Sequence, residues 1–182
     1  GWSQSEENYI DFAKALEKAG ADFVTLHART RSQMYQGSAD WNKIKLLKQE
    51  VSIPVFANGD IKTIQDATTC LSLTKADGVS IGRGIMGDFT LPYRIEKYIN
   101  DGVKIEEPSL KEKIEMLKEH LKLEVELMGE VNGVKFMRKF YNYYISSTRN
   151  ASKYRSVLVL LEKQKEILEV LDEILSIHSS DQ

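Results

Sequence analysis

The sequence has a single cysteine, Cys70, in 182 residues, which excludes an intramolecular disulfide framework. A reducing environment is therefore expected, and the cytoplasm is the simplest setting. No run of about 18 apolar residues occurs, so we expect no membrane-spanning helix. The first residues lack the basic-then-apolar pattern of a secretory signal. No cluster of histidine and cysteine has metal-ligand spacing, so no metal site is expected.

Residues 1–102 alternate between helical patterns and short apolar runs. The spacing of apolar residues predicts helices over residues 5–18, 40–50, 63–74 and 91–99. The short apolar runs between them predict strands over residues 23–26, 53–57 and 78–81. This α/β alternation is typical of right-handed βαβ units, which place their strands in a parallel sheet covered by helices.

The predicted sheet is incomplete. Three strands cannot close a barrel, and an open sheet of three strands would leave two unprotected edges. The sequence also opens in the middle of an element, with no preceding strand to pair. We therefore expect an N-terminal portion of the fold to be absent from this chain. The exposed strand edges predict self-association or pairing with that portion.

After Gly102 the alternation stops and the pattern becomes helical throughout. Ser109 and Glu112 form a capping-box pattern, which predicts the start of a helix that ends near Gly129. Apolar stripes predict two further helices, over residues 133–145 and 152–177. Residues 103–182 are therefore expected to form a small all-α antiparallel bundle.

Polar residues and glycines stand at the end of each predicted strand. The first strand is followed by His27, the second by Asn58-Gly59-Asp60, and the third by Gly82-Arg83-Gly84. In a βα barrel these strand ends share one mouth, where ligands bind. Gly82 and Gly84 would let backbone N–H groups approach an anion, and Arg83 supplies a positive charge. Their convergence favours a cofactor that carries phosphate.

Each of these residues also has an ordinary structural interpretation. Taken alone, residues 82–84 would form a tight turn with a surface arginine. Asn58 and Asp60 alone would form an Asx turn between strand and helix. His27 could hydrogen-bond within the barrel mouth, and the arginines that follow it could be solvated surface residues.

The helical part distributes its charge unevenly, although the formal net charge of the chain is only −2. No acidic residue occurs between Glu130 and Glu162, where basic and aromatic residues are interleaved. Lys135, Arg138 and Lys139 have the spacing of one helix face. A basic face beside aromatic residues favours RNA-phosphate binding. The alternative is an ordinary solvated helix, which usually mixes both signs of charge.

Other residues favour packing over chemistry. Phe136, Phe140 and Tyr143 follow helical spacing on a neighbouring face and are expected to pack into the bundle. Cys70 lies inside a predicted helix and is expected to be a packed thiol. His120 is expected on a helix face, with an RNA or interdomain contact as the alternative.

Three runs of sequence resemble the signature of tRNA-dihydrouridine synthases. They are residues 27–41, HARTRSQMYQGSADW, residues 53–61, IPVFANGDI, and residues 77–84, DGVSIGRG. A looser resemblance covers Phe136-Met137-Arg138-Lys139 followed by Tyr144. Together these runs extend over nearly the whole chain.

The resemblance implies an oxidoreductase that reduces uridine to 5,6-dihydrouridine in tRNA, with FMN as cofactor and NADPH as reductant. It implies the C-terminal half of an FMN-binding (β/α)8 TIM barrel over residues 1–102 and a helical tRNA-binding domain over residues 103–182. The positions that match the family's cofactor-binding residues are His27, Asn58, Gly59, Asp60, Gly82 and Arg83. Those expected to bind RNA are Arg29, Arg31, Lys135, Arg138 and Lys139. Of these, Arg29 and Arg31 would lie at the barrel mouth, where either tRNA phosphates or flavin could be reached.

The resemblance also places the family's proton-donating cysteine in the absent front half, and Cys70 does not match its motif. We therefore expect no catalytic residue in this chain and no reductase activity of the chain alone. Ala28, residues 87–89 and Phe140 depart from the family pattern. The change at Ala28 is mild, and the other two bear on the phosphate and tRNA contacts. Two alternatives stay open: a different FMN-dependent TIM-barrel oxidoreductase acting on a small substrate, and a non-catalytic RNA-binding piece.

Overall fold

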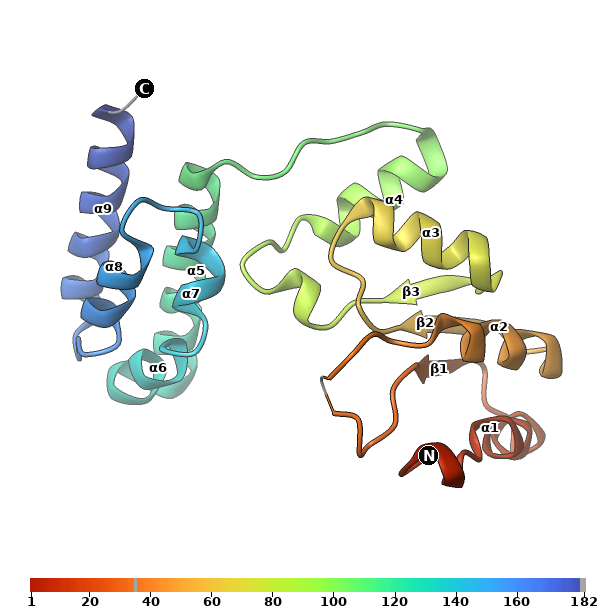
Figure 1. Ribbon diagram of the computed structural model, residues 1–182. Helices are drawn as coiled ribbons and strands as arrows, with labels where there is room; N and C mark the ends of the chain where they lie inside the picture. The colour runs from red at the N-terminus through yellow and green to blue at the C-terminus, as the bar shows by residue number, and fades with distance from the viewer. Residues whose placement is uncertain (35, 181–182) are drawn as a thin grey trace. The chain divides into compact units, whose positions relative to one another are not determined.

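The computed structural model describes residues 1–34 and 36–180, so Tyr35 of the first motif lies outside the described residues. The described chain is a mixed α/β structure, mostly helical, with a small parallel sheet (Figure 1). None of its described helices is long and apolar enough to cross a membrane. The chain divides into two compact units. The first comprises Gly1–Ile85 and Leu91–Ile105, and the second Met86–Thr90 and Glu106–Gln182.

The first unit contains the parallel sheet that the alternating sequence pattern predicts. Its elements in chain order are η1 (Gln4–Glu6), α1 (Tyr9–Lys18), β1 (Val24–His27), α2 (Trp41–Glu50), β2 (Val55–Asn58), α3 (Ile64–Thr74), β3 (Gly78–Ser80), η2 (Arg83–Ile85) and α4 (Leu91–Asp101). The strand order is β1-β2-β3, and both pairs are parallel. The register aligns His27 with Asn58 and Asn58 with Ser80, so these three residues form one row at the carboxyl end of the sheet.

Apolar side chains from the strands and the covering helices form the core of this unit. Its buried members include Val24, Val55 and Ala57 of the strands, Ile44 and Leu47 of α2, and Ala67 and Cys70 of α3. Full burial of each large aliphatic side chain contributes about 1.5–3 kcal/mol. The start of α3 is fixed by a capping box, in which the hydroxyl of Thr63 accepts from the N–H of Asp66 and the Asp66 carboxylate accepts from the N–H of Thr63.

The second unit contains helices around a separate core. They are α5 (Leu110–Met128), α6 (Glu130–Met137), α7 (Tyr141–Ile145), α8 (Ala151–Leu158) and α9 (Gln164–Ser180). The predicted capping box at Ser109 and Glu112 is present at the start of α5. Large, fully buried side chains of this core include Ile114, Leu117, Leu121, Met137, Tyr141, Tyr144, Ile145, Leu158 and Ile167.

The prediction of two continuous helices, over residues 133–145 and 152–177, is wrong because each is interrupted. The predicted helix over residues 133–145 is divided between α6 and α7, and the one over residues 152–177 between α8 and α9. Long-range contacts stabilise both breaks. Arg138 Nη2 donates to the backbone oxygen of Leu161 at 3.4 Å, and the Glu130 carboxylate accepts from the N–H of Gln164 at 3.0 Å, which caps α9.

The break between α6 and α7 also changes which aromatic residues enter the core. Phe136 and Tyr143, expected inside, are 37% and 42% exposed, and Phe140 is partly buried. Tyr141 and Tyr144 are buried instead, at 0% and 1% exposed. A turn at residues 138–140 alters the helical phase, so side chains that share one face of a continuous helix separate here.

Candidate functional site

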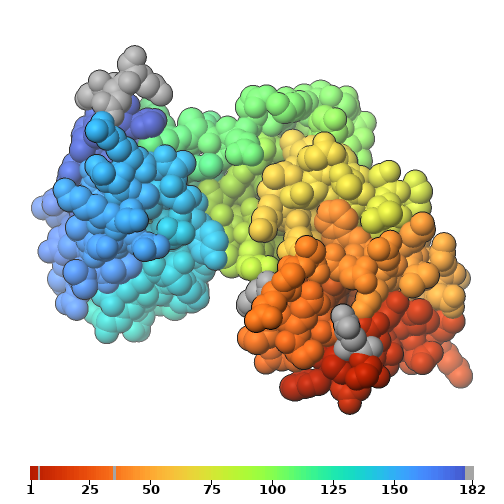
Figure 2. Space-filling view, viewed as in Figure 1, coloured from red at the N-terminus to blue at the C-terminus, as the bar shows by residue number. Residues whose placement is uncertain are grey.

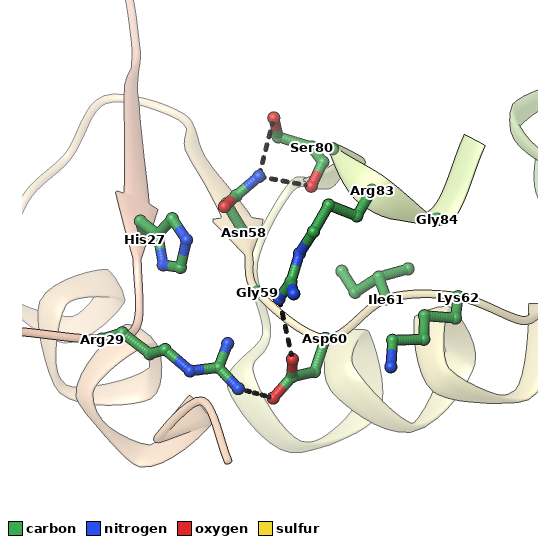
Figure 3. A pocket seen from close by; sticks show the side chains of 11 residues that line it. His27, Arg29, Asn58, Gly59, Asp60, Ile61, Lys62, Ser80, Arg83 and Gly84 are labelled. Carbon is green, nitrogen blue, oxygen red and sulfur yellow. Dashed lines mark hydrogen bonds and ion pairs between the residues drawn. The ribbon is translucent and has the colours of Figure 1, made fainter. Parts of the chain in front are cut away.

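A pocket of about 200 Å³ lies at the carboxyl ends of the three strands (Figure 3). Its lining comes from the strand ends and the segments that follow them: His27, Arg29, Asn58, Gly59, Asp60, Ile61, Lys62, Ser80, Gly82, Arg83 and Gly84. The structure therefore brings together all of the residues predicted from sequence to bind a cofactor. The parallel register is the cause, because it aligns the ends of neighbouring strands.

Asn58 joins the end of β2 to the end of β3. Its Nδ2 donates to the backbone oxygen of Ser80 at 2.8 Å and lies 3.3 Å from Ser80 Oγ. These contacts fix the orientation of the side-chain amide in the pocket wall (Figure 3). Sequence reasoning missed Ser80, and its position near the end of the strand predicted over residues 78–81 is the signal that could have found it.

Asp60 uses its carboxylate to hold the pocket wall. Its Oδ2 accepts from Arg29 Nη2 at 2.6 Å and from the N–H of Ala39 at 2.8 Å. Burial opposes ionisation of this carboxyl, but the hydrogen bonds from Arg29 and Ala39 outweigh it and hold the pKa of Asp60 below its usual range. An ionised Asp60 therefore ties the loop after β1 to the loop after β2.

Arg29, which the sequence places among the residues expected to bind RNA, lies in the pocket wall. The Arg29 side chain is only 4% exposed, and its Nη2 also donates to the backbone oxygen of Gly37 at 2.9 Å. The partner that draws it inward is Asp60, 31 residues further along the chain. Arg31 is exposed on the same loop. The segment that follows β1 is coloured orange in Figure 2.

His27 ends β1 and faces the same pocket. Burial lowers the pKa of His27, and the positive charges of Arg29 and Arg83 lower it further, while Asp60 opposes them. The imidazole is therefore neutral near pH 7, with one nitrogen able to donate a hydrogen bond and the other able to accept one.

Gly82 and Gly84 have different roles, although the sequence pattern predicted the same role for both. A Cβ at Gly84 would lie 2.2 Å from the backbone oxygen of Ile61, so glycine here lets η2 pack against the segment after β2. A Cβ at Gly82 would meet no described atom within 4 Å, so only Gly82 has open space beside it. Arg83 follows with a side chain that is 43% exposed and an Nη2 that lies 4.0 Å from Asp60 Oδ1.

The charges of the lining residues favour an anionic ligand. The cationic side chains are Arg29, Lys62 and Arg83, and the single carboxylate is Asp60. With His27 neutral, these four residues give the pocket a formal charge of +2. A ligand that carries phosphate would balance that charge.

Cys70 is a packed thiol, as its place in the sequence predicts. It is buried in α3, and burial raises its pKa to about 11. A thiol with that pKa is almost wholly protonated at pH 7, and Cys70 is not among the residues that line the pocket.

The predicted RNA-binding residues of the second unit lie around the end of α6. Lys135 and Lys139 are exposed, and Arg138 is partly buried against Leu161. Because α6 ends at Met137, these side chains do not share one continuous helix face. Lys139 Nζ instead lies 3.7 Å from the centre of the exposed Phe136 ring, a cation–π contact.

His120 lies in an aromatic cluster of the second unit, with its side chain 17% exposed. Its Nδ1 is 2.9 Å from the hydroxyl of Tyr144, and its ring centre is 5.6 Å from that of Phe89 and 5.0 Å from that of Phe140. Burial lowers the pKa of His120, and the nearby carboxylate of Glu124 opposes the shift. These contacts give His120 a packing role.

Comparison with known proteins gives a consistent family assignment. A family model described as dihydrouridine synthase matches residues 1–179. A probable tRNA-dihydrouridine synthase of Rickettsia bellii is 36% identical over 180 residues, which cover 99% of this chain and 54% of the relative. One from Synechocystis is 38% identical over 97% of this chain and 49% of the relative. A tRNA-dihydrouridine synthase B of Pseudomonas putida is 36% identical over 89% of this chain and 48% of the relative.

The matches extend through both compact units, since the family model covers residues 1–179. The chain spans about half the length of the curated relatives it matches. On this evidence the chain belongs to the dihydrouridine synthase family.

Proposed function

We propose that this chain forms part of a flavin-dependent enzyme that reduces uridine to 5,6-dihydrouridine in tRNA, with NADPH as the reductant. The observation that carries the proposal is the pocket at the carboxyl ends of β1, β2 and β3. In a chain of this family, that pocket gathers every residue that the sequence resemblance led us to expect at the cofactor. The basic and aromatic surface around the end of α6 supports RNA as the substrate.

The proposal includes the fold of the whole enzyme. The parallel sheet of the first unit would be part of a (β/α)8 TIM barrel, with residues 1–102 as its C-terminal half. Residues 103–182 would form the helical tRNA-binding domain. The position of the pocket supports the barrel, because ligands bind at the carboxyl ends of barrel strands.

Flavin mononucleotide suits the residues of the pocket. The formal charge of +2 and the open space beside Gly82 match a phosphate group, which Gly82 and Arg83 would hold. Asn58 and Gly59 would contact the ring, and Asp60 would keep the wall in place through Arg29. When bound, the flavin supplies the hydride chemistry.

The protein's own residues would orient the reacting groups. The amide of Asn58 is held by Ser80, so it presents a fixed edge to a ligand. Neutral His27 can donate or accept a hydrogen bond without adding charge to the pocket. A uridine in folded tRNA is stacked, so it must be extruded from the stack to reach this site.

The RNA-binding surface would act mainly through the phosphate backbone. Lys135, Lys139 and Arg31 are exposed and can approach phosphates directly. Arg138 is partly buried, so we propose that it stabilises this surface from its inner side. There it keeps its hydrogen bond to the backbone oxygen of Leu161. Recognition through shape and backbone is the usual mode for folded RNA.

Reconstitution with the part of a relative that this chain does not cover tests the proposed function. The 182-residue chain would be joined to the front half of the Rickettsia bellii protein and supplied with FMN, NADPH and tRNA that lacks dihydrouridine. We expect dihydrouridine in that tRNA, and none when the 182-residue chain is used alone, because Cys70 is buried and no other cysteine is present.

A joined protein that binds FMN but leaves the tRNA unchanged would contradict the proposed function. If that protein instead reduces a free pyrimidine or an enone and does not react with tRNA, the alternative is favoured, namely an FMN-dependent TIM-barrel oxidoreductase that acts on a small substrate. Activity of the 182-residue chain alone would contradict the need for a proton donor outside it.

A further inference from the structure

Arg29 has hydrogen-bonding capacity that the described part of the protein does not use. Its side chain is 4% exposed and its Nη2 is bonded to Asp60 and Gly37. Its Nε and Nη1 are buried, and neither has a hydrogen-bond partner among the described residues. Buried polar groups are almost always paired, and an unpaired charged donor is destabilising. The lack of partners for these two nitrogens therefore needs an explanation.

The position of the guanidinium indicates what could complete its bonds. Arg29 lines the pocket beside His27 and Gly59, and its bond to Asp60 fixes the orientation of the guanidinium plane. In Figure 3 its other terminal nitrogen points away from Asp60, into the space next to His27. An acceptor atom in the pocket could therefore receive a hydrogen bond from a donor that is already in place.

The chemistry of that acceptor follows from the surrounding charges. Asp60 already balances the charge of Arg29, so a fully charged phosphate would have to be buried here beside a carboxylate. Arg83 and Lys62 are more exposed and better suited to a hydrated phosphate. The site at Arg29 therefore suits a carbonyl oxygen or ring nitrogen that carries partial negative charge.

We propose that Arg29 is a further ligand-binding residue of this pocket, which donates through its unpaired N–H groups to the acceptor edge of the flavin ring. This inference rests on the proposed function and deepens it. The acceptor edge is the N1 and C2-carbonyl side, where negative charge collects when the flavin accepts two electrons. Arg29 would then favour the reduced form of the flavin over the oxidised form.

Binding of FMN in its two redox states tests this role, in the protein that joins the 182-residue chain to the front half of the Rickettsia bellii protein. The dissociation constant is measured for oxidised flavin and for reduced flavin without oxygen, in the wild type and in Arg29→Gln. We expect at least a tenfold loss of the preference for reduced flavin, which lowers the two-electron potential by about 30 mV. Arg29→Lys should recover part of the preference, since it keeps the charge. Lys45→Gln on the exposed face of α2 removes a charge remote from the pocket and should change nothing.

A double variant controls for misfolding of the single variant, because Arg29→Gln alone leaves the Asp60 carboxylate without its charged partner. Arg29→Gln with Asp60→Asn replaces the ion pair by a neutral pair and leaves the formal charge of the pocket at +2. The same loss of preference is expected in this variant. An unchanged preference in either folded variant would overturn the role of Arg29 and leave the proposed function standing. Absence of flavin binding by the wild-type protein would overturn both.

Discussion

At the scale of single residues, Asp60 organises the pocket. It accepts hydrogen bonds from Arg29 and from the N–H of Ala39, and it lies 4.0 Å from Arg83. The guanidinium groups of Arg29 and Arg83 therefore both lie next to the Asp60 carboxylate, whose negative charge holds the two cations close together. Repulsion between those cations would otherwise separate them, so the carboxylate lets the pocket keep its positive charge.

The two glycines around Arg83 offer a matched pair of substitutions. Gly84→Ala should destabilise the fold by about 1–3 kcal/mol, because the new Cβ would lie 2.2 Å from the backbone oxygen of Ile61 and η2 must move. Gly82→Ala should leave the free energy of unfolding nearly unchanged but weaken FMN binding, since its methyl group fills the open space proposed for phosphate. Urea unfolding and FMN titration measure the two effects. Equal loss of stability in both variants would contradict this assignment.

The protonation of His120 should contribute to stability in a defined pH range. Because its pKa is lowered in the folded state, the unfolded state binds the proton more readily. The stability contributed by neutral His120 is present above the ordinary histidine pKa of about 6.5 and is lost as pH falls toward the folded pKa. His120→Gln should lose less stability than the wild type between about pH 7.5 and 5.5 in urea unfolding. Parallel pH profiles would contradict this expectation.

The identity of the pocket residues could be predicted from sequence, but their interactions could not. His27, Asn58 and Arg83 could be assigned to one mouth because parallel strands align their carboxyl ends. The burial of Arg29 could not be foreseen, since it depends on Asp60, 31 residues away. The dihydrouridine synthase signature contains both residues and gives no sign that they pair.

At the scale of elements, the ends of helices determine which side chains reach the surface. Apolar spacing correctly indicated helical structure on both sides of residues 138–140 and residues 159–163. It could not indicate the breaks, which depend on interactions between distant segments. Glu130 caps α9 at Gln164, and Arg138 reaches Leu161. These interactions expose Phe136 beside Lys139 and remove each of the two from the helix face predicted for it.

The surface at the end of α6 gives a prediction about salt dependence. Replacing both Lys135 and Lys139 by Gln should weaken tRNA binding. It should also reduce the slope of log affinity against log salt concentration by about 1 for each phosphate that is no longer neutralised. The matched control is Lys122→Gln, an exposed lysine of α5. Fluorescence anisotropy with tRNA at several salt concentrations measures both quantities. Equal slopes in the double variant and the control would count against this surface.

At the scale of the whole molecule, the chain carries two cores and an open sheet. β1 and β3 each pair with one strand within the described sheet. Large apolar side chains are exposed on the same unit, including Trp2 at 65%, Phe12 at 62% and Phe23 at 57%. Exposed strand edges and apolar side chains favour association with another chain or segment.

The 182-residue chain alone should therefore self-associate, through its sheet edges and the exposed apolar side chains near β1. The chain joined to the front half of the Rickettsia bellii protein should associate less, because that half would cover the same surface. Light scattering over a range of concentrations measures the mass of both. A monomer at every concentration for the 182-residue chain would contradict this prediction.

Binding of FMN in the pocket at the strand ends is tested most directly by a crystal structure of the protein grown with FMN. We expect density for the phosphate beside Gly82 and Arg83, and for the ring beside His27, Asn58 and Arg29. Flavin bound at another surface, or a pocket that stays without flavin at saturating concentration, would contradict the proposed site.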